Sequence, residues 1–152
     1  MMNYLRTFAV IFLNLAIFAA CAAKGPVEVG MELYQDGKYA EAIEYISQAI
    51  QNPEHEDELY LLYFHRAEAY KASEDPQKAF RDYYAAKILS CYLTKHSQNT
   101  GGYAKGLIPA NYCNQWADNR MALVSSDIPE KDQKTIKQDV EKLLDKYRIP
   151  EK

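Results

Sequence analysis

The segment Gly37-Lys38-Tyr39-Ala40-Glu41-Ala42-Ile43-Glu44-Tyr45 sets the pattern for the folded part of this 152-residue chain. It contains a turn signal at Gly37 and begins a run that continues beyond Tyr45. In this run the small and apolar residues Ala42, Ile46 and Ala49 are separated by four and then three positions. Residues at this spacing lie on one face of an α-helix. The segment therefore predicts a turn followed by an amphipathic helix.

The same pattern returns 37 residues later. Ala42, for example, corresponds to Ala79 (79 − 42 = 37). Other residues pair by the same shift, small with small and apolar with apolar: Gly30 with Ala67, Leu33 with Tyr70, Ile43 with Phe80, Ile46 with Tyr83, and Ala49 with Ala86. A second turn signal, Ser73-Glu74-Asp75-Pro76, falls where the first copy has Asp36-Gly37-Lys38. Self-similarity at this period predicts stacked helical hairpins.

Two antiparallel helices per unit, a small residue where they cross and a tyrosine near the turn resemble a tetratricopeptide repeat. The first copy carries the likeness in Gly30, Gly37, Tyr39, Ala42, Ile46, Ala49 and Pro53, and the second in Tyr63, Ala67, Tyr70, Ala79, Tyr83 and Ala86. Such repeats are about 34 residues long, and the additional residues here fall in the polar connection 52–59. The resemblance covers residues 26–94 and implies an all-α solenoid with two clear repeats.

Residues 112–152 are expected to complete this solenoid, because about three repeats are needed to bury the apolar faces. They are predicted to form a C-terminal helical cap or a degenerate third repeat, with residues 116–124 as its first helix. The second helix carries an apolar stripe of Ile136, Val140, Leu143, Leu144 and Tyr147. Residues 95–111 contain three glycines and Pro109 without a helical period and are predicted to form a long loop, which is usually functional or disordered.

The first 20 residues indicate export. A single basic residue, Arg6, precedes an apolar run from Phe8 to Ala20 that is too short to span a bilayer, for which about 20 apolar residues are needed. The segment Phe18-Ala19-Ala20-Cys21 resembles the lipobox of bacterial lipoproteins, although leucine is usual in place of Phe18. The resemblance implies that Cys21 is lipidated and becomes the mature N-terminus, with residues 21–25 as a tether. The alternative is an ordinary signal peptide, cleaved near Cys21 to release a soluble secreted protein.

The lipoprotein resemblance also implies a location. Lipoproteins carry more than one acyl chain, which is enough for stable anchoring, and Ala22 is not the aspartate that typically retains them in the inner membrane. The expected site is therefore the bacterial cell envelope, at the outer membrane facing the periplasm. Removing Arg6 changes the charge from 18 − 21 = −3 to 17 − 21 = −4. A mildly acidic chain without a basic block predicts no nucleic-acid partner and a membrane attachment through lipid alone.

Few residues suggest chemistry. Cys91 and Cys113 flank the predicted loop and form either a disulfide, which an oxidising compartment permits, or two buried free thiols. The glycine-rich segment 101–106 lacks the lysine and hydroxyl residue of a phosphate loop. No nucleophile elbow, paired-histidine helix or Cys/His nucleophile pattern is found in the sequence. We therefore expect no enzyme activity, catalytic residue, metal or cofactor.

The repeat resemblance implies that a protein or peptide partner binds the concave face made by the first helices. That face is expected to include Met31, Tyr34, Phe64, Glu68 and Lys71. The lysine and asparagine set with which some family members bind C-terminal carboxylates is absent, so the ligand class stays open. The sequence predicts a lipid-anchored adaptor for protein–protein interaction in the envelope. The alternatives are a pilotin-like or assembly factor for an outer-membrane or secretion complex, and an accessory to cell-wall or polysaccharide enzymes.

Overall fold

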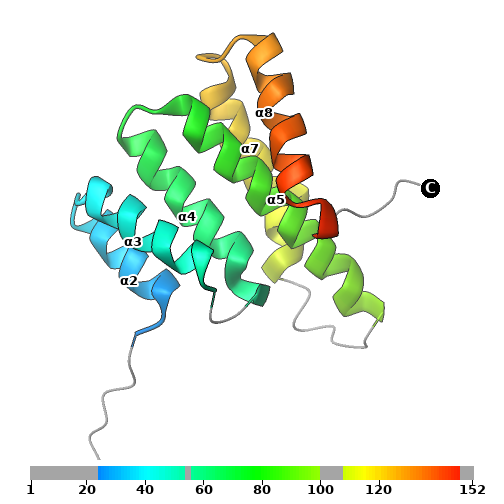
Figure 1. Cartoon of the computed structure of the whole chain (residues 1–152), viewed down its shortest axis with the longest axis horizontal. Coiled ribbons are helices and arrows are strands. Elements are labelled where there is room, and N and C mark those ends of the chain that lie inside the picture. Colours follow the sequence, from blue (N-terminus) through cyan, green and yellow to red (C-terminus); the bar gives the residue numbers. More distant parts are fainter. Residues whose placement is uncertain (1–23, 54–55, 100–107, 148–152) are drawn as a thin grey trace, which may run out of the picture.

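The computed structural model describes residues 24–53, 56–99 and 108–147 (Figure 1). These residues form an all-α domain of six packed helices, without a strand in the described ranges. Two helical hairpins make up the N-terminal half: α2 (Pro26–Gln35) with α3 (Tyr39–Gln51), and α4 (Leu59–Ala72) with α5 (Pro76–Asn99). A 3-10 turn, η2 (Glu56–Glu58), leads into α4. The α-helical class predicted from the periodicity is confirmed.

The turns of both hairpins have the same geometry. Gly37 follows α2 with a positive φ of 74°, and Glu74 follows α4 with a φ of 59°. In each turn the next amide N–H donates to the helix carbonyl five residues back, at 2.9 Å. This closure of a helix C-terminus favours glycine, because a side chain is strained at positive φ. Asp75 then caps α5 by accepting a hydrogen bond from the Lys78 amide at 3.1 Å.

Small residues let the helices of each hairpin approach closely. A Cβ atom at Gly30 would lie 2.5 Å from Cγ1 of Ile46 on α3, so α2 and α3 pack with no room for a side chain at that point. Ala42, Ala67 and Ala79 are fully buried. Of the tyrosines that carry the repeat likeness in the second copy, Tyr63 and Tyr83 are buried and Tyr70 is partly buried against the core.

Enlarging one of these small residues tests the packing. Ala79→Leu is expected to lower the free energy of unfolding by about 1–3 kcal/mol, because the extra methylenes do not fit a filled interior. Chemical denaturation followed by circular dichroism measures the change. Ala122 is exposed on α7, so Ala122→Leu serves as the matched control and should change the stability by less than about 0.5 kcal/mol. Equal stabilities of the two variants would contradict the close packing at Ala79.

A buried ion pair links three helices of the N-terminal half. Arg66 on α4 donates from Nε and Nη2 to the two carboxylate oxygens of Asp82 on α5, at 2.6 and 2.9 Å. Its Nη1 donates to Ser47 Oγ on α3 at 3.0 Å. Asp82 is 1% exposed and the Arg66 side chain 11%. The rings of Tyr63 and Tyr70 lie 5.3 and 5.8 Å from the guanidinium carbon, so the cation is held between aromatic faces.

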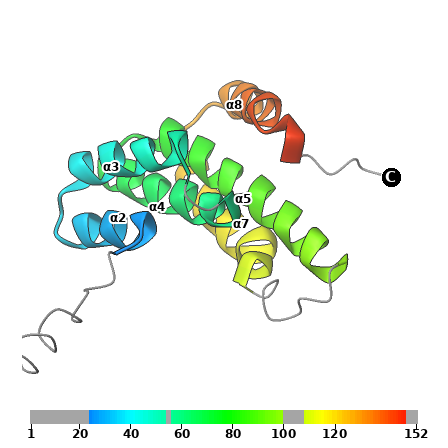
Figure 2. The ribbon, with the colours of Figure 1, turned by 60° about the horizontal axis from the view of Figure 1, so that its bottom comes forward.

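The C-terminal half packs around α5. The chain is helical again from residue 108 and continues as α7 (Ala117–Ser125). Between them lies one turn of π-helix, η3 (Tyr112–Trp116), which we call the π-turn. It then turns back as α8 (Glu130–Leu143), which ends in the 3-10 turn η4 (Asp145–Tyr147). Both α7 and α8 contact α5, and Figure 2 shows them on different sides of that helix. The helix predicted over residues 116–124 is therefore present but begins earlier.

The predicted loop 95–111 is wrong at both ends. α5 extends to Asn99, and residues 108–111 are helical. The extension of α5 is supported by packing: Tyr92 lies against Tyr147 with ring centroids 5.4 Å apart, and the His96 ring stacks on Tyr92 at 3.9 Å. Residues 100–107 lie outside the described residues.

The apolar stripe of α8 is only partly buried. Val140, Leu144 and Tyr147 are buried, and Ile136 packs against the core, but Leu143 is 56% exposed. The prediction that Leu143 belongs to the buried face is therefore wrong. α5 is the main helical neighbour of α8, and a single neighbour covers a narrower strip than the sequence stripe provides.

The predicted signal peptide and Cys21 also lie outside the described residues. Among the residues that the structure describes, no helix is both long and apolar enough to cross a membrane.

Candidate partner-binding groove

A groove of about 470 Å³ lies between α4 and the helical segment that ends in α7. Its lining residues are Phe64, Trp116, Asn119, Arg120 and Leu123, and we call it the α4/α7 groove. Trp116 is 45% exposed and Leu123 57% exposed, although both are large and apolar. They lie seven residues apart, which is two helical turns, so they share one face of the helix.

Aromatic rings form the base of this groove. The Phe64 ring is 4.8 Å from the Tyr112 ring, and Tyr112 is in turn 4.7 Å from Trp116, both in edge-to-face geometry. Phe64 also contacts Tyr83 at 5.5 Å. Because Phe64 and Tyr112 are buried, the exposed ring of Trp116 rests on a rigid support.

The π-turn is the reason why Trp116 faces solvent. Across it, the Ala117 amide donates to the carbonyl of Tyr112, five residues back. Tyr112 and Ala117 are therefore both buried although five positions separate them. In an uninterrupted α-helix, Trp116 would follow Tyr112 on the same face four residues later. Insertion of the additional residue turns Trp116 away from the core, and such π-turns are frequent at functional sites.

A short polar network fixes one wall of the groove. Arg120 Nε lies 2.9 Å from Glu68 Oε1, and the Tyr83 hydroxyl donates to the same oxygen at 2.8 Å. The Glu68 side chain is 13% exposed, while that of Arg120 is 42% exposed. Arg120 is thus held by its Nε and keeps part of its guanidinium accessible. Burial lowers the pKa of His65, one turn before Glu68 on α4, so that this ring is neutral at pH 7 and adds no second cation.

The five residues predicted to line a binding face do not lie in one site. Phe64 lines the groove, but it is only 7% exposed and acts as its floor. Glu68 serves as the buried partner of Arg120. Tyr34 is half-buried beside Tyr39, with a ring separation of 5.5 Å, and Lys71 lies in the last turn of α4 outside the groove lining.

Met31 contributes to a second hollow, which we call the α2/α4 depression. Its volume is about 500 Å³, and its lining residues are Gly25, Val27, Glu28, Met31, Glu32, Gln35, Glu58 and Leu61. Leu61 and Phe64 are one helical turn apart on α4, so the depression and the α4/α7 groove are next to each other along this helix. The predicted face is therefore divided into two adjacent sites.

Sequence reasoning missed the three residues that give the α4/α7 groove its chemistry, Trp116, Arg120 and Leu123. A signal was present, because residues 116–124 were predicted to be the first helix of a third unit. These residues were assigned to a cap, whereas the binding face was expected on the first helices of the two clear copies.

Cys91 on α5 and Cys113 in the π-turn form a disulfide with their Cα atoms 4.8 Å apart. Lys87 Nζ adds an ion pair with Asp118 Oδ1 at 2.7 Å between the same two segments. The groove wall that carries Trp116 is thus covalently joined to the central helix of the domain.

The sequence matches no protein-family model, no curated protein and no solved structure.

Proposed function

We propose that this protein is a lipid-anchored tetratricopeptide-repeat adaptor of the bacterial cell envelope, which docks another envelope protein in the α4/α7 groove. The observation that carries the proposal is the pair of exposed apolar side chains, Trp116 and Leu123, on a groove wall with Arg120 between them. Binding energy at protein interfaces concentrates in a few residues, with Trp, Tyr and Arg enriched among them. A tryptophan supported by buried rings also loses little conformational freedom when a partner binds.

The burial pattern of the two hairpins supports the repeat assignment. Ala42 and Ala79 are both fully buried, and so are Ile46 and Tyr83, which correspond by the same shift of 37 residues. The turns at Gly37 and Glu74 correspond as well and share one hydrogen-bond pattern. These corresponding positions share the same burial, although Ile43 and Ala49 are only partly buried where Phe80 and Ala86 are buried.

The envelope location is supported by two independent features. A disulfide such as Cys91–Cys113 is typical of exported proteins, because cytosolic thiols are kept reduced. The N-terminal sequence carries an export signal followed by the lipobox-like cysteine.

Site-specific photo-crosslinking in cells tests the docking function. A photoreactive amino acid in place of Leu123 is expected to give a discrete crosslinked adduct, while the same amino acid at the exposed neighbour Ala122 should give none. Trp116→Ala, combined with the photoreactive Leu123 position, should lower the adduct yield at least about tenfold, because truncation of an anchor costs about 2 kcal/mol or more. Gel electrophoresis and mass spectrometry measure the yield.

Tyr45 provides the matched control, since it is 37% exposed on α3 and lies outside the groove lining. Tyr45→Ala should leave the adduct yield unchanged. Equal adducts from Leu123 and Ala122, or an adduct indifferent to Trp116→Ala, would contradict docking in this groove.

The anchor is tested separately. Intact mass spectrometry of the mature protein should show acyl chains on Cys21, and Cys21→Ser should leave an uncleaved precursor or move the protein out of the membrane fraction. A wild-type mass without added acyl chains would instead indicate an ordinary secreted protein.

A further inference from the structure

The α2/α4 depression combines an apolar floor with an acidic rim. Val27 and Leu61 pack against the hydrophobic core and, with Met31, supply the floor. The rim carries the carboxylates of Glu28, Glu32 and Glu58.

These carboxylates are only partly neutralised. Glu32 pairs with Lys24, and the charge of Lys24 also interacts with Glu28. Among the described residues, no side chain forms an ion pair with Glu28 or Glu58. Asp57 immediately precedes Glu58 in η2 and adds negative charge at this edge, whereas Glu56 is paired with Lys146 at 3.5 Å. The depression therefore offers apolar contact together with an excess of negative charge.

We infer that the α2/α4 depression binds a segment of the partner protein in which cationic side chains flank apolar ones. Apolar side chains of such a segment would bury Met31 and Leu61, while lysine or arginine side chains would pair with Glu28 and Glu58. This inference rests on the proposed adaptor function and names the chemistry of its partner. Because Leu61 and Phe64 are neighbours on α4, the same partner can extend along this helix into the α4/α7 groove.

Charge disfavours the other simple occupants. An anionic lipid surface, a nucleic acid or an acidic peptide would meet the carboxylates of Glu28 and Glu58 with like charge, which raises the cost of association. A purely apolar segment would leave the carboxylates of the rim without cationic partners. A cationic amphipathic segment contacts the apolar floor and pairs with the carboxylates of the rim.

The test uses three short fluorescent peptides and the full-length chain in phosphatidylcholine nanodiscs, with empty discs as the blank. One peptide contains leucine and lysine with leucines at helical spacing, the second replaces lysine with glutamate, and the third replaces leucine with serine. Fluorescence anisotropy should show binding of the leucine–lysine peptide at least about tenfold tighter than of either other peptide. The affinity should fall as salt is added, since exposed ion pairs are screened.

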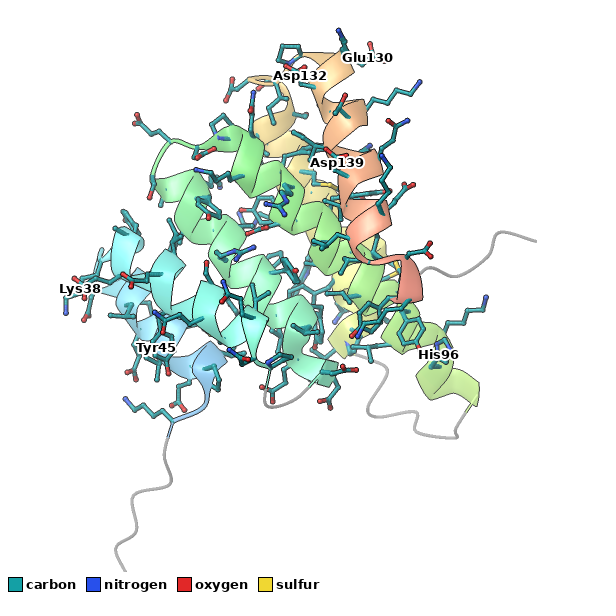
Figure 3. All side chains as sticks on the ribbon, in the orientation of Figure 1. Lys38, Tyr45, His96, Glu130, Asp132 and Asp139 are labelled. Carbon is teal, nitrogen blue, oxygen red and sulfur yellow. A yellow bond between two sulfur atoms is a disulfide. The ribbon has the colours of Figure 1, made fainter. Side chains whose placement is uncertain are left out.

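Two charge-reversal variants with the same net charge make the test specific. Glu28→Lys/Glu58→Lys should weaken binding of the leucine–lysine peptide by about tenfold or more, because each exposed ion pair contributes up to about fivefold in affinity and reversal adds repulsion. Glu130→Lys/Asp139→Lys changes two exposed acids on α8, which Figure 3 shows far from α2. This control should keep the affinity within about twofold.

Equal losses in the two variants would mean that net charge alone attracts the peptide, and the inference would be overturned. Tighter binding of the leucine–glutamate peptide would overturn it too. So would a dimer in sedimentation velocity that becomes a monomer with Glu28→Lys/Glu58→Lys, because a second copy of the chain would then be the occupant. If the Leu123 crosslink persists while the leucine–lysine peptide fails to bind, the proposed adaptor function is retained. Only the inference that the depression binds a cationic amphipathic segment is then overturned.

Discussion

Asp82→Asn is expected to lower the free energy of unfolding by about 3–5 kcal/mol, the largest loss that we expect from a single substitution in this chain. The change keeps the size of the side chain but leaves the Arg66 guanidinium, which is only 11% exposed, without its anionic partner. Ser47 offers one hydrogen bond to Arg66 and no compensating charge. For a domain of this size the loss corresponds to a drop of roughly 10–20 °C in melting temperature, measured by scanning calorimetry.

An exposed ion pair provides the matched control. Asp118→Asn removes the partner of Lys87, but the Asp118 side chain is 46% exposed, so the loss should stay below about 1 kcal/mol. The double variant Arg66→Met/Asp82→Leu should recover most of the stability lost in Asp82→Asn, because removing both charges leaves none unpaired. A double variant as unstable as Asp82→Asn would show that the pair contributes through its shape and hydrogen bonds rather than through the cost of an orphaned charge.

Removal of the disulfide is expected to have the second-largest effect. Cys91 and Cys113 are 22 residues apart, and a crosslink that closes a loop of this size stabilises by about 3 kcal/mol. Cys91→Ser/Cys113→Ser should lose this amount in chemical denaturation, and the wild type should lose a similar amount when dithiothreitol is added. The reductant should not affect the double variant further.

Trp116 provides a second readout of the same change, because it is the chain's single tryptophan and lies in the π-turn with Cys113. Without the disulfide, the indole is expected to become more exposed to water, with a red-shifted fluorescence maximum and weaker crosslinking from Leu123. An unchanged spectrum together with full crosslinking would mean that the ring packing of Trp116 on Tyr112 is sufficient to hold the groove wall.

The N-terminal hairpins were largely predictable because their determinants are local. The turn after α2 needs a residue that accepts a positive φ, and Gly37 signals it directly. The spacing of Ala42, Ile46 and Ala49 places them on one helix face whatever the rest of the chain does. The second turn is indicated by the segment Ser73-Glu74-Asp75-Pro76, although the residue with positive φ in it, Glu74, is not a glycine.

The candidate site was less predictable because it depends on contacts between distant segments. Phe64 occupies a first-helix position that predicts an exposed anchor, yet it is buried when Tyr112 packs against it from 48 residues later (112 − 64 = 48). Glu68 changes in the same way from a predicted binding residue to the support of Arg120. No periodic pattern in the sequence indicates either contact.

The sequence by itself determined the helical class, the two hairpins and their turns, since these follow from side-chain spacing and from backbone conformations at single residues. Tertiary structure alone decided which apolar residues stay exposed. Leu143 and Leu123 have spacing typical of packed helices, but they lie on faces that no described neighbour covers fully. The π-turn that exposes Trp116 allows Tyr112 and Ala117 to reach the core together. That arrangement depends on the shape of the space beside α5, which no single segment encodes.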